Sequence, residues 1–138
     1  MVDWIMKVPS LVFNRILTDF SQDMKTKYAM TRDNFSSVSS NSKDPVFPFV
    51  FVHLLSVAEQ GTDLERTSIN VARFTFQIDV YDNKSQIRAR NVMGEIARIM
   101  RLMRFTVAET PELEGTDEQH RCTLRFGRNI GEYDILVS

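Results

Sequence analysis

The side chains in this sequence that could do chemistry are two histidines, one cysteine and a few closely spaced carboxylates. His53 and His120 are the only histidines, and Cys122 is the only cysteine. A metal site would need ligands at spacings such as H-x-x-x-H or C-x-x-C, and neither pattern occurs. We therefore read both histidines as ordinary strand residues and expect no metal and no cofactor.

The thiol of Cys122 could in principle attack a substrate with the help of either histidine. A catalytic thiol needs an electropositive and partly exposed setting. Cys122 instead alternates with Leu124 and Phe126 on the apolar side of a predicted strand, which favours a buried structural thiol. We expect no catalytic residue and no enzyme, and we keep a small hydrolase or transferase as the hypothesis from another class.

Two pairs of carboxylates have a spacing that could support acid–base chemistry: Asp79 with Asp82, and Glu132 with Asp134. Asp79 falls on the polar face of a predicted strand, and Asp82 is well placed to cap the turn into the following helix. Capping is the simpler explanation. Neither G-x-x-x-x-G-K-[ST] nor G-x-G-x-x-G is present, so the sequence gives no support for a phosphate-binding loop.

Charge is segregated along the second half of the chain, where arginines crowd one segment and carboxylates crowd the next. At about 100° per residue, four of the arginines project beside the apolar stripe of a predicted helix. The candidate interaction surface consists of Arg90, Arg98, Arg101, Arg104, Glu112, Glu114, Asp117 and Glu118.

Three interpretations of this arginine face remain open. It could be a solvated face whose side-chain stems cover apolar surface. It could contact an acidic partner surface, such as the Glu-rich segment of a neighbouring subunit. It could also contact DNA electrostatically, although the segment lacks interleaved aromatic residues for base stacking.

The elements that must position these residues are clearest between Arg73 and Phe105. Phe74, Phe76, Ile78 and Val80 alternate with polar residues, which predicts a half-buried strand. After Asp82 the period changes. The apolar residues then recur at spacings of three and four, which predicts an amphipathic helix over residues 85–103: Ala89, Val92, Met93, Ile96, Ile99, Met100 and Met103.

The rest of the chain completes a small domain. We predict a helix at 9–27, beginning at Pro9, and strands at 49–58, 68–81, from 105, and at 120–126, the last ended by Gly127. Residues 31–45 should form a mobile polar loop, 109–119 an acidic loop, and 133–137 a short strand or docking tail. The predicted fold is α+β: one domain over residues 1–138, with a mostly antiparallel four-stranded sheet packed against two main helices in the order α-β-β-α-β-β.

Composition narrows the possible functions. The 138 residues carry a formal net charge of −1, so there is no global attraction to nucleic acid or to an anionic membrane. No apolar run approaches the roughly 20 residues of a membrane span, and a single cysteine allows no intrachain disulfide. We expect a protein of the cytosol.

The pattern resembles the tail terminator proteins of long-tailed bacteriophages, also called tail-completion or tail-to-head joining proteins. The residues that carry the resemblance are the segments VPSLVFNRILTDF, PVFPFVFVHLLSV, FTFQIDVYDNKSQIRARNVMGEIARIM and RCTLRFGRNI. In that family an alternating aromatic strand, a short polar turn and a long helix are followed by a late strand. These are patterns of residue class, and they cover most of the chain.

The resemblance implies a structural protein of the virion that is assembled in the host cytoplasm and has no catalytic residues. Such a protein is a homo-oligomer, expected to be a hexameric ring. The ring caps the tail tube, ends its polymerisation and joins the tail to the head connector or stopper protein. DNA could pass through the ring, without sequence-specific contact or membrane contact. The alternatives are a head-closure or neck adaptor of the connector, and a nucleic-acid-binding module that uses the arginine face.

Overall fold

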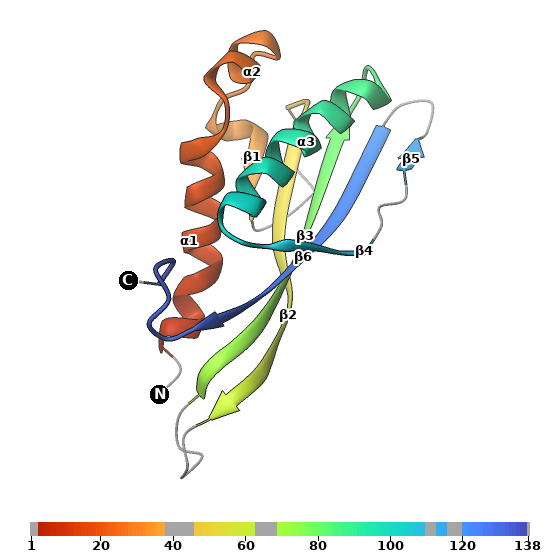
Figure 1. Cartoon of the computed structure of the whole chain (residues 1–138). Helices are drawn as coiled ribbons and strands as arrows, with labels where there is room; N and C mark the ends of the chain where they lie inside the picture. Colours follow the sequence, from red (N-terminus) through yellow and green to blue (C-terminus); the bar gives the residue numbers. More distant parts are fainter. Residues whose placement is uncertain (1–2, 38–45, 63–68, 110–112, 116–119, 138) are drawn as a thin grey trace.

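The chain folds as α+β, with one twisted sheet covered on a single face by helices (Figure 1). The computed structural model describes residues 3–37, 46–62, 69–109, 113–115 and 120–137. The elements in these ranges are α1 (Asp3–Asp19), α2 (Gln22–Lys27), the 3-10 turn η1 (Arg32–Asn34), β1 (Phe35–Ser36), β2 (Phe49–Thr62), β3 (Ile69–Asp82), α3 (Gln86–Leu102), β4 (Thr106–Glu109), β5 (Leu113–Gly115) and β6 (His120–Gly131).

The sheet has six strands in the described residues, in the order β1-β2-β3-β6-β4, and β5 also pairs with β6. β2 and β3 correspond to the predicted strands 49–58 and 68–81 and pair as an antiparallel hairpin, and β6 pairs antiparallel with β3. The prediction of four strands was too low because β1 and β5 are only two and three residues long. The sheet is mixed, since the β1–β2 pair is parallel.

The predicted strand–turn–helix unit is confirmed and forms the centre of the core. Every apolar residue predicted to face inward from β3 and α3 is buried. Ser85 is the N-cap of α3, and its hydroxyl accepts a hydrogen bond from the N–H of Arg88 at 2.9 Å. Phe76 meets Phe105 edge to face with the ring centroids 5.7 Å apart. The helix layer therefore closes over one face of β3 and β6, and the other face remains open.

The N-terminal helix differs from the prediction in both its start and its continuity. α1 begins at Asp3, with Pro9 inside it, and ends at Asp19, where the chain bends and restarts as α2. Trp4 belongs to α1 and packs edge to face on Phe74 at 6.2 Å. Burial of Trp4 explains why the helix extends upstream of Pro9, because tertiary packing outweighs the lost N–H of a proline.

The predicted polar loop 31–45 is wrong over its first part. Thr31 and Asn34 form a reciprocal capping box around η1, and the Asn34 side chain donates to the Pro48 carbonyl at 2.8 Å. Phe35 is buried against Phe20, with the ring centroids 5.3 Å apart. A single aromatic residue in a polar stretch has therefore docked this segment onto the core. Residues 38–45 lie outside the described residues.

The C-terminal third corrects two further predictions. β6 continues through Gly127 to Gly131, and it pairs with β3 along this whole length. A Cβ at Gly127 would lie 2.5 Å from Nη2 of Arg73, whose side chain occupies that space. β5 lies inside the predicted acidic loop 109–119 and pairs with β6. Residues 133–137 form turns rather than a strand, and Leu136 and Val137 pack against the core as a docking tail.

Gly94 lies in the middle of α3, and replacing it tests whether this position limits the stability of the helix. A Cβ built at this exposed position meets no atom within 4 Å. Glycine inside a helix is about 0.5–1 kcal/mol less favourable than alanine. We expect Gly94→Ala to raise the free energy of unfolding by about that amount in urea denaturation. A loss of stability would contradict the open surroundings of this residue.

Candidate interaction surfaces

Arg98, one of the four predicted surface arginines, is used inside the chain. Its guanidinium donates two hydrogen bonds to Glu95, at 2.8 and 2.7 Å, and a third to the Asp19 carbonyl at 3.1 Å. Glu95 is 9% exposed and also accepts from the N–H of Ser21 at 2.8 Å. The pair thus fastens α3 to the bend between α1 and α2, and Arg98 is a structural residue.

Glu95 gives this fastening a pH dependence. The hydrogen bond from Arg98 holds the pKa of the Glu95 carboxyl below its ordinary value of 4.5. A carboxyl whose pKa is lower in the folded chain stabilises the fold above the ordinary value, and this contribution is lost as the pH falls through the folded pKa. We expect Glu95→Gln to cost about 1–3 kcal/mol at pH 7 and to flatten this part of the acid titration. An unchanged slope below pH 4.5 in urea denaturation would contradict the assignment.

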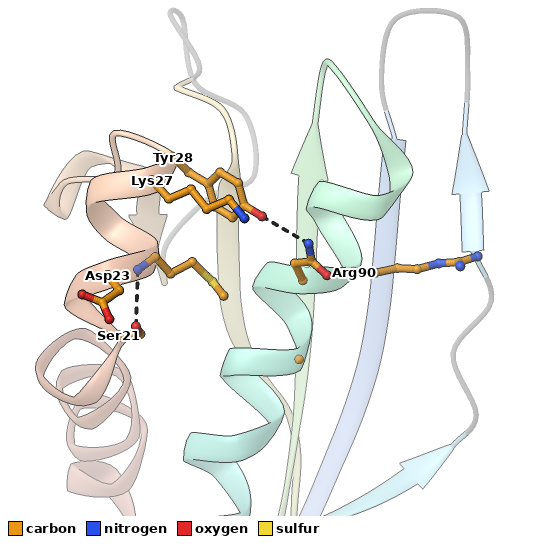
Figure 2. A pocket seen from close by; sticks show the side chains of 8 residues that line it. Ser21, Asp23, Lys27, Tyr28 and Arg90 are labelled. Carbon is orange, nitrogen blue, oxygen red and sulfur yellow. Dashed lines mark hydrogen bonds between the residues drawn. The ribbon is translucent and has the colours of Figure 1, made fainter.

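The other three arginines lie on the outer side of α3 or just beyond it. Arg90 and Arg101 are exposed, and Figure 2 shows the Arg90 side chain pointing away from α2. Arg104 has a left-handed backbone, with φ of 67°. Its N–H donates to the Arg101 carbonyl and that of Phe105 to the Met100 carbonyl, at 2.8 and 2.9 Å. This is the Schellman ending of a helix, in which the Arg104 position normally holds glycine.

The predicted acidic partners are only partly within the described residues. Glu114 lies in β5, where the register places it beside Arg121 of β6, and Glu109 at the end of β4 is placed beside Arg125. Glu112, Asp117 and Glu118 lie outside the described residues. Part of the acidic segment is therefore paired in register with arginines of its own sheet.

A shallow groove lies between α2 and α3 (Figure 2). It encloses about 380 Å³ and is lined by Ser21, Asp23, Met24, Lys27, Tyr28, Arg90, Asn91 and Gly94. Asn91 donates a hydrogen bond to the Tyr28 hydroxyl at 3.2 Å across the groove. No nucleophile is paired with a base among these lining residues.

The open face of the sheet carries a polar cluster around Asp79, which is 3% exposed although no helix covers it. Asp79 accepts hydrogen bonds from Thr123, from Arg121 at 3.2 and 3.4 Å, and from Gln77 at 3.3 Å. Nε2 of His53 lies 3.5 Å from its second oxygen, and the His53 ring stacks on Phe51 at 4.4 Å. With its oxygens engaged in this way, Asp79 is organised to hold neighbouring strands together.

The thiol of Cys122 lies on the other face of the sheet from His53. Cys122 pairs with Val80 in the register and is buried, as predicted. Burial raises the pKa of this thiol above its ordinary value. A reactive cysteine requires the opposite shift. The geometry therefore gives the hydrolase hypothesis no support.

One exposed apolar surface within the described residues was not predicted from the sequence. We call it the tail patch and define it as Leu102, Arg104, Tyr133 and Ile135. Leu102, Tyr133 and Ile135 are 60%, 90% and 87% exposed. Except for Tyr133, these residues line a hollow of about 380 Å³ between the end of α3 and the C-terminal tail. Large exposed apolar side chains gathered at one place are typical of a protein–protein contact.

The tail patch is held in shape by polar contacts beneath it. The Arg128 guanidinium donates to the Asp134 carboxylate, which also accepts from the N–H of Leu136 at 3.0 Å. A second exposed apolar pair, Leu55 and Val57, lies on β2. We call this pair the β2 patch; Val57 pairs in register with Phe74, the residue on which Trp4 of α1 packs.

Within the described residues, no group of three or more histidine, cysteine or acidic side chains could hold a metal ion. None of the helices there is long and apolar enough to cross a membrane. The sequence matches no protein-family model, and no curated protein matches it either.

Proposed function

We propose that this chain is a structural subunit that assembles into a ring. The observation that carries the proposal is the presence of two separate exposed apolar surfaces, the tail patch and the β2 patch. A head-to-tail contact joins different surfaces of neighbouring copies, and such contacts close into a ring when the rotation permits. A chain with distinct outer patches suits this kind of assembly better than catalysis.

We further propose that the ring is the tail terminator of a long-tailed bacteriophage, located at the junction of tail and head in the virion. The resemblance of the strand–turn–helix unit to that family supports this step. The α+β fold and the buried unit at its centre are compatible with it. In this role the ring, expected to be a hexamer, would end tube polymerisation and bind the head connector.

The experiment that tests the proposal combines native mass spectrometry with negative-stain imaging of the purified chain, alone and with purified tail tubes. We expect annular particles of one stoichiometry that attach to tube ends. A strict monomer at every concentration that never binds tubes would refute the ring.

The neck adaptor is the second candidate from the sequence. The same protein would then be mixed with tail-less heads in a pull-down. Binding to heads in the absence of tubes, with no binding to tube ends, would replace the terminator assignment by the adaptor assignment.

A further inference from the structure

We propose that the tail patch of one copy receives the β2 patch of the next copy. This inference rests on the proposed ring and names the two surfaces that join neighbouring subunits. In this contact Leu55 enters the hollow beside the C-terminal tail, and Arg104 pairs with Glu59. The occupant of the tail patch is thus a second copy of this chain.

The hollow of the tail patch can receive an apolar side chain. Leu102 and Met103 line it from the end of α3, and Ile135 and Leu136 line it from the tail, so apolar groups face it from two elements. Leu102 and Ile135 are mostly exposed in the single chain. An apolar side chain that enters the hollow would leave water together with them, as happens at the centre of a protein contact.

The hollow also carries a positive charge that its own chain leaves unpaired. Three arginines and one carboxylate line it. Arg128 pairs with that carboxylate, Asp134, and Arg15 pairs with Asp19 at 2.6 Å. Arg104 is exposed, and no described residue forms an ion pair or hydrogen bond with its guanidinium. The tail patch therefore selects an apolar surface that carries a carboxylate.

The β2 patch presents apolar side chains at a bulge. The register of β2 on β3 shifts between Leu54 and Ser56, so Leu55 is the extra residue of a β-bulge. Leu55 is 44% exposed, and Val57 on the same strand is 38% exposed. A bulge works against the addition of a further strand along an edge. The β2 patch is therefore suited to a contact made by side chains.

Glu59 supplies the carboxylate, two residues beyond the β2 patch. It is exposed, and no described residue forms an ion pair with it. Its partner in the register is Ala72, so no basic residue stands opposite it on β3. Arg73 is in register with Ala58, on the other face of the strand, and donates to Asn129 at 3.4 Å. The charge of Glu59 thus complements that of Arg104.

One copy can use both surfaces at once. In the sheet, β2 lies on one side of β3 and β6, which leads into the tail, lies on the other. The hollow has no lining residue in β2. A contact between unlike surfaces leaves each copy with one surface of each kind to offer, so the contacts propagate until the ring closes.

Charge reversal tests the pairing of Arg104 with Glu59. Arg104→Glu and Glu59→Lys should each raise the concentration needed for assembly about tenfold, because like charges then meet. The chain with both substitutions should assemble like the native chain, since every contact again joins opposite charges. Arg90→Glu changes another exposed arginine of the same region of sequence and should leave assembly unchanged. Native mass spectrometry over a dilution series measures all four variants.

Apolar substitutions test the hollow. Leu55→Asp and Ile135→Asp should each abolish ring formation, because a carboxylate would have to leave water without a partner. Ile87→Asp is the control at another exposed apolar residue and should form rings.

Cross-linking tests the contact without a change of charge. A chain with Leu55→Cys is mixed with a chain with Ile135→Cys and treated with oxidised glutathione. The disulfide-linked pairs should contain one chain of each kind, and neither variant alone should cross-link. Pairs formed within one variant would show that like surfaces meet and would overturn the proposal.

The outcomes separate this inference from the proposed function. Native rings that persist in Leu55→Asp and Ile135→Asp, or that give no mixed disulfide pair, overturn the contact and leave the ring in place. A double charge variant that assembles no better than the single variants also overturns it. Absence of rings in the native chain instead removes the proposed function, and this contact with it.

Discussion

Arg88→Met is expected to lower the free energy of unfolding by about 3–5 kcal/mol, because it leaves a buried carboxylate without its counter-ion. Asp82 is fully buried at the turn between β3 and α3. Nη2 of Arg88 lies 2.9 Å from one of its oxygens, and the other accepts from the N–H groups of Lys84 and Ser85 at 3.3 and 3.0 Å. The arginine also lies over the ring of Tyr28 at 5.3 Å, which links this turn to α2.

Urea denaturation of two matched variants distinguishes the effect of losing the Arg88 charge from the effect of changing its side-chain packing. Arg90→Met removes an exposed arginine from the same helix and should change stability by about 0.5 kcal/mol or less. Asp82→Asn combined with Arg88→Met removes both charges and retains an oxygen that can accept from the turn. The double variant should be more stable than Arg88→Met alone. If Arg88→Met lowers the free energy of unfolding no more than Arg90→Met does, loss of the arginine does not leave the Asp82 carboxylate as an unpaired buried charge.

The strand–turn–helix unit could be predicted from sequence because both of its periods are long and regular. β3 alternates over many residues, and the apolar stripe of α3 extends over four turns. Asp82 was expected to cap the turn into α3; the N-cap is Ser85, and Asp82 accepts from the N–H groups of Lys84 and Ser85 in the turn before it. Its complete burial and its pairing with Arg88 could not be predicted, because both depend on how α3 packs onto the sheet.

The elements that the sequence failed to predict are those in which a tertiary contact outweighs the local preference of the sequence. Phe35 draws a polar stretch onto Phe20, and the two residues of β1 are too few to show a period. In the sequence, Pro9 resembles the start of a helix and Gly127 resembles the end of a strand. Pro9 lies inside α1, which Trp4 anchors to the sheet. Gly127 lies inside β6, beside the Arg73 guanidinium.

The arginine face was predicted as a group, but its members have different roles. The spacing of Glu95 and Arg98, three residues apart on one helix, could have indicated that Arg98 has a partner in its own chain. The absence of a glycine after α3 could have drawn attention to Arg104. No pattern in the sequence predicts the tail patch, because residues 102–104 and residues 134–135 are far apart in the chain and lie around one hollow only in the folded structure.

Phe76→Ala should also cost about 3–5 kcal/mol, because a large cavity would open where the helices meet the sheet. Phe76 is 1% exposed, contacts Phe105 edge to face, and is in register with Leu54 of β2 and Phe126 of β6. For a domain of this size the loss would lower the melting temperature by roughly 10 °C or more. Calorimetry or thermal denaturation monitored by circular dichroism measures it.

Phe51→Ala is the matched control, because Phe51 lies on the open face of the same sheet and is only partly buried. Removing this ring takes less apolar surface from a packed environment, so its cost should be clearly smaller than that of Phe76→Ala. Equal costs would mean that a second layer covers the open face in solution. Assembly is the obvious source of such a layer. The stability losses of Phe76→Ala and Phe51→Ala are therefore compared above and below the concentration at which rings form. This comparison shows whether the open face also contacts a neighbouring subunit.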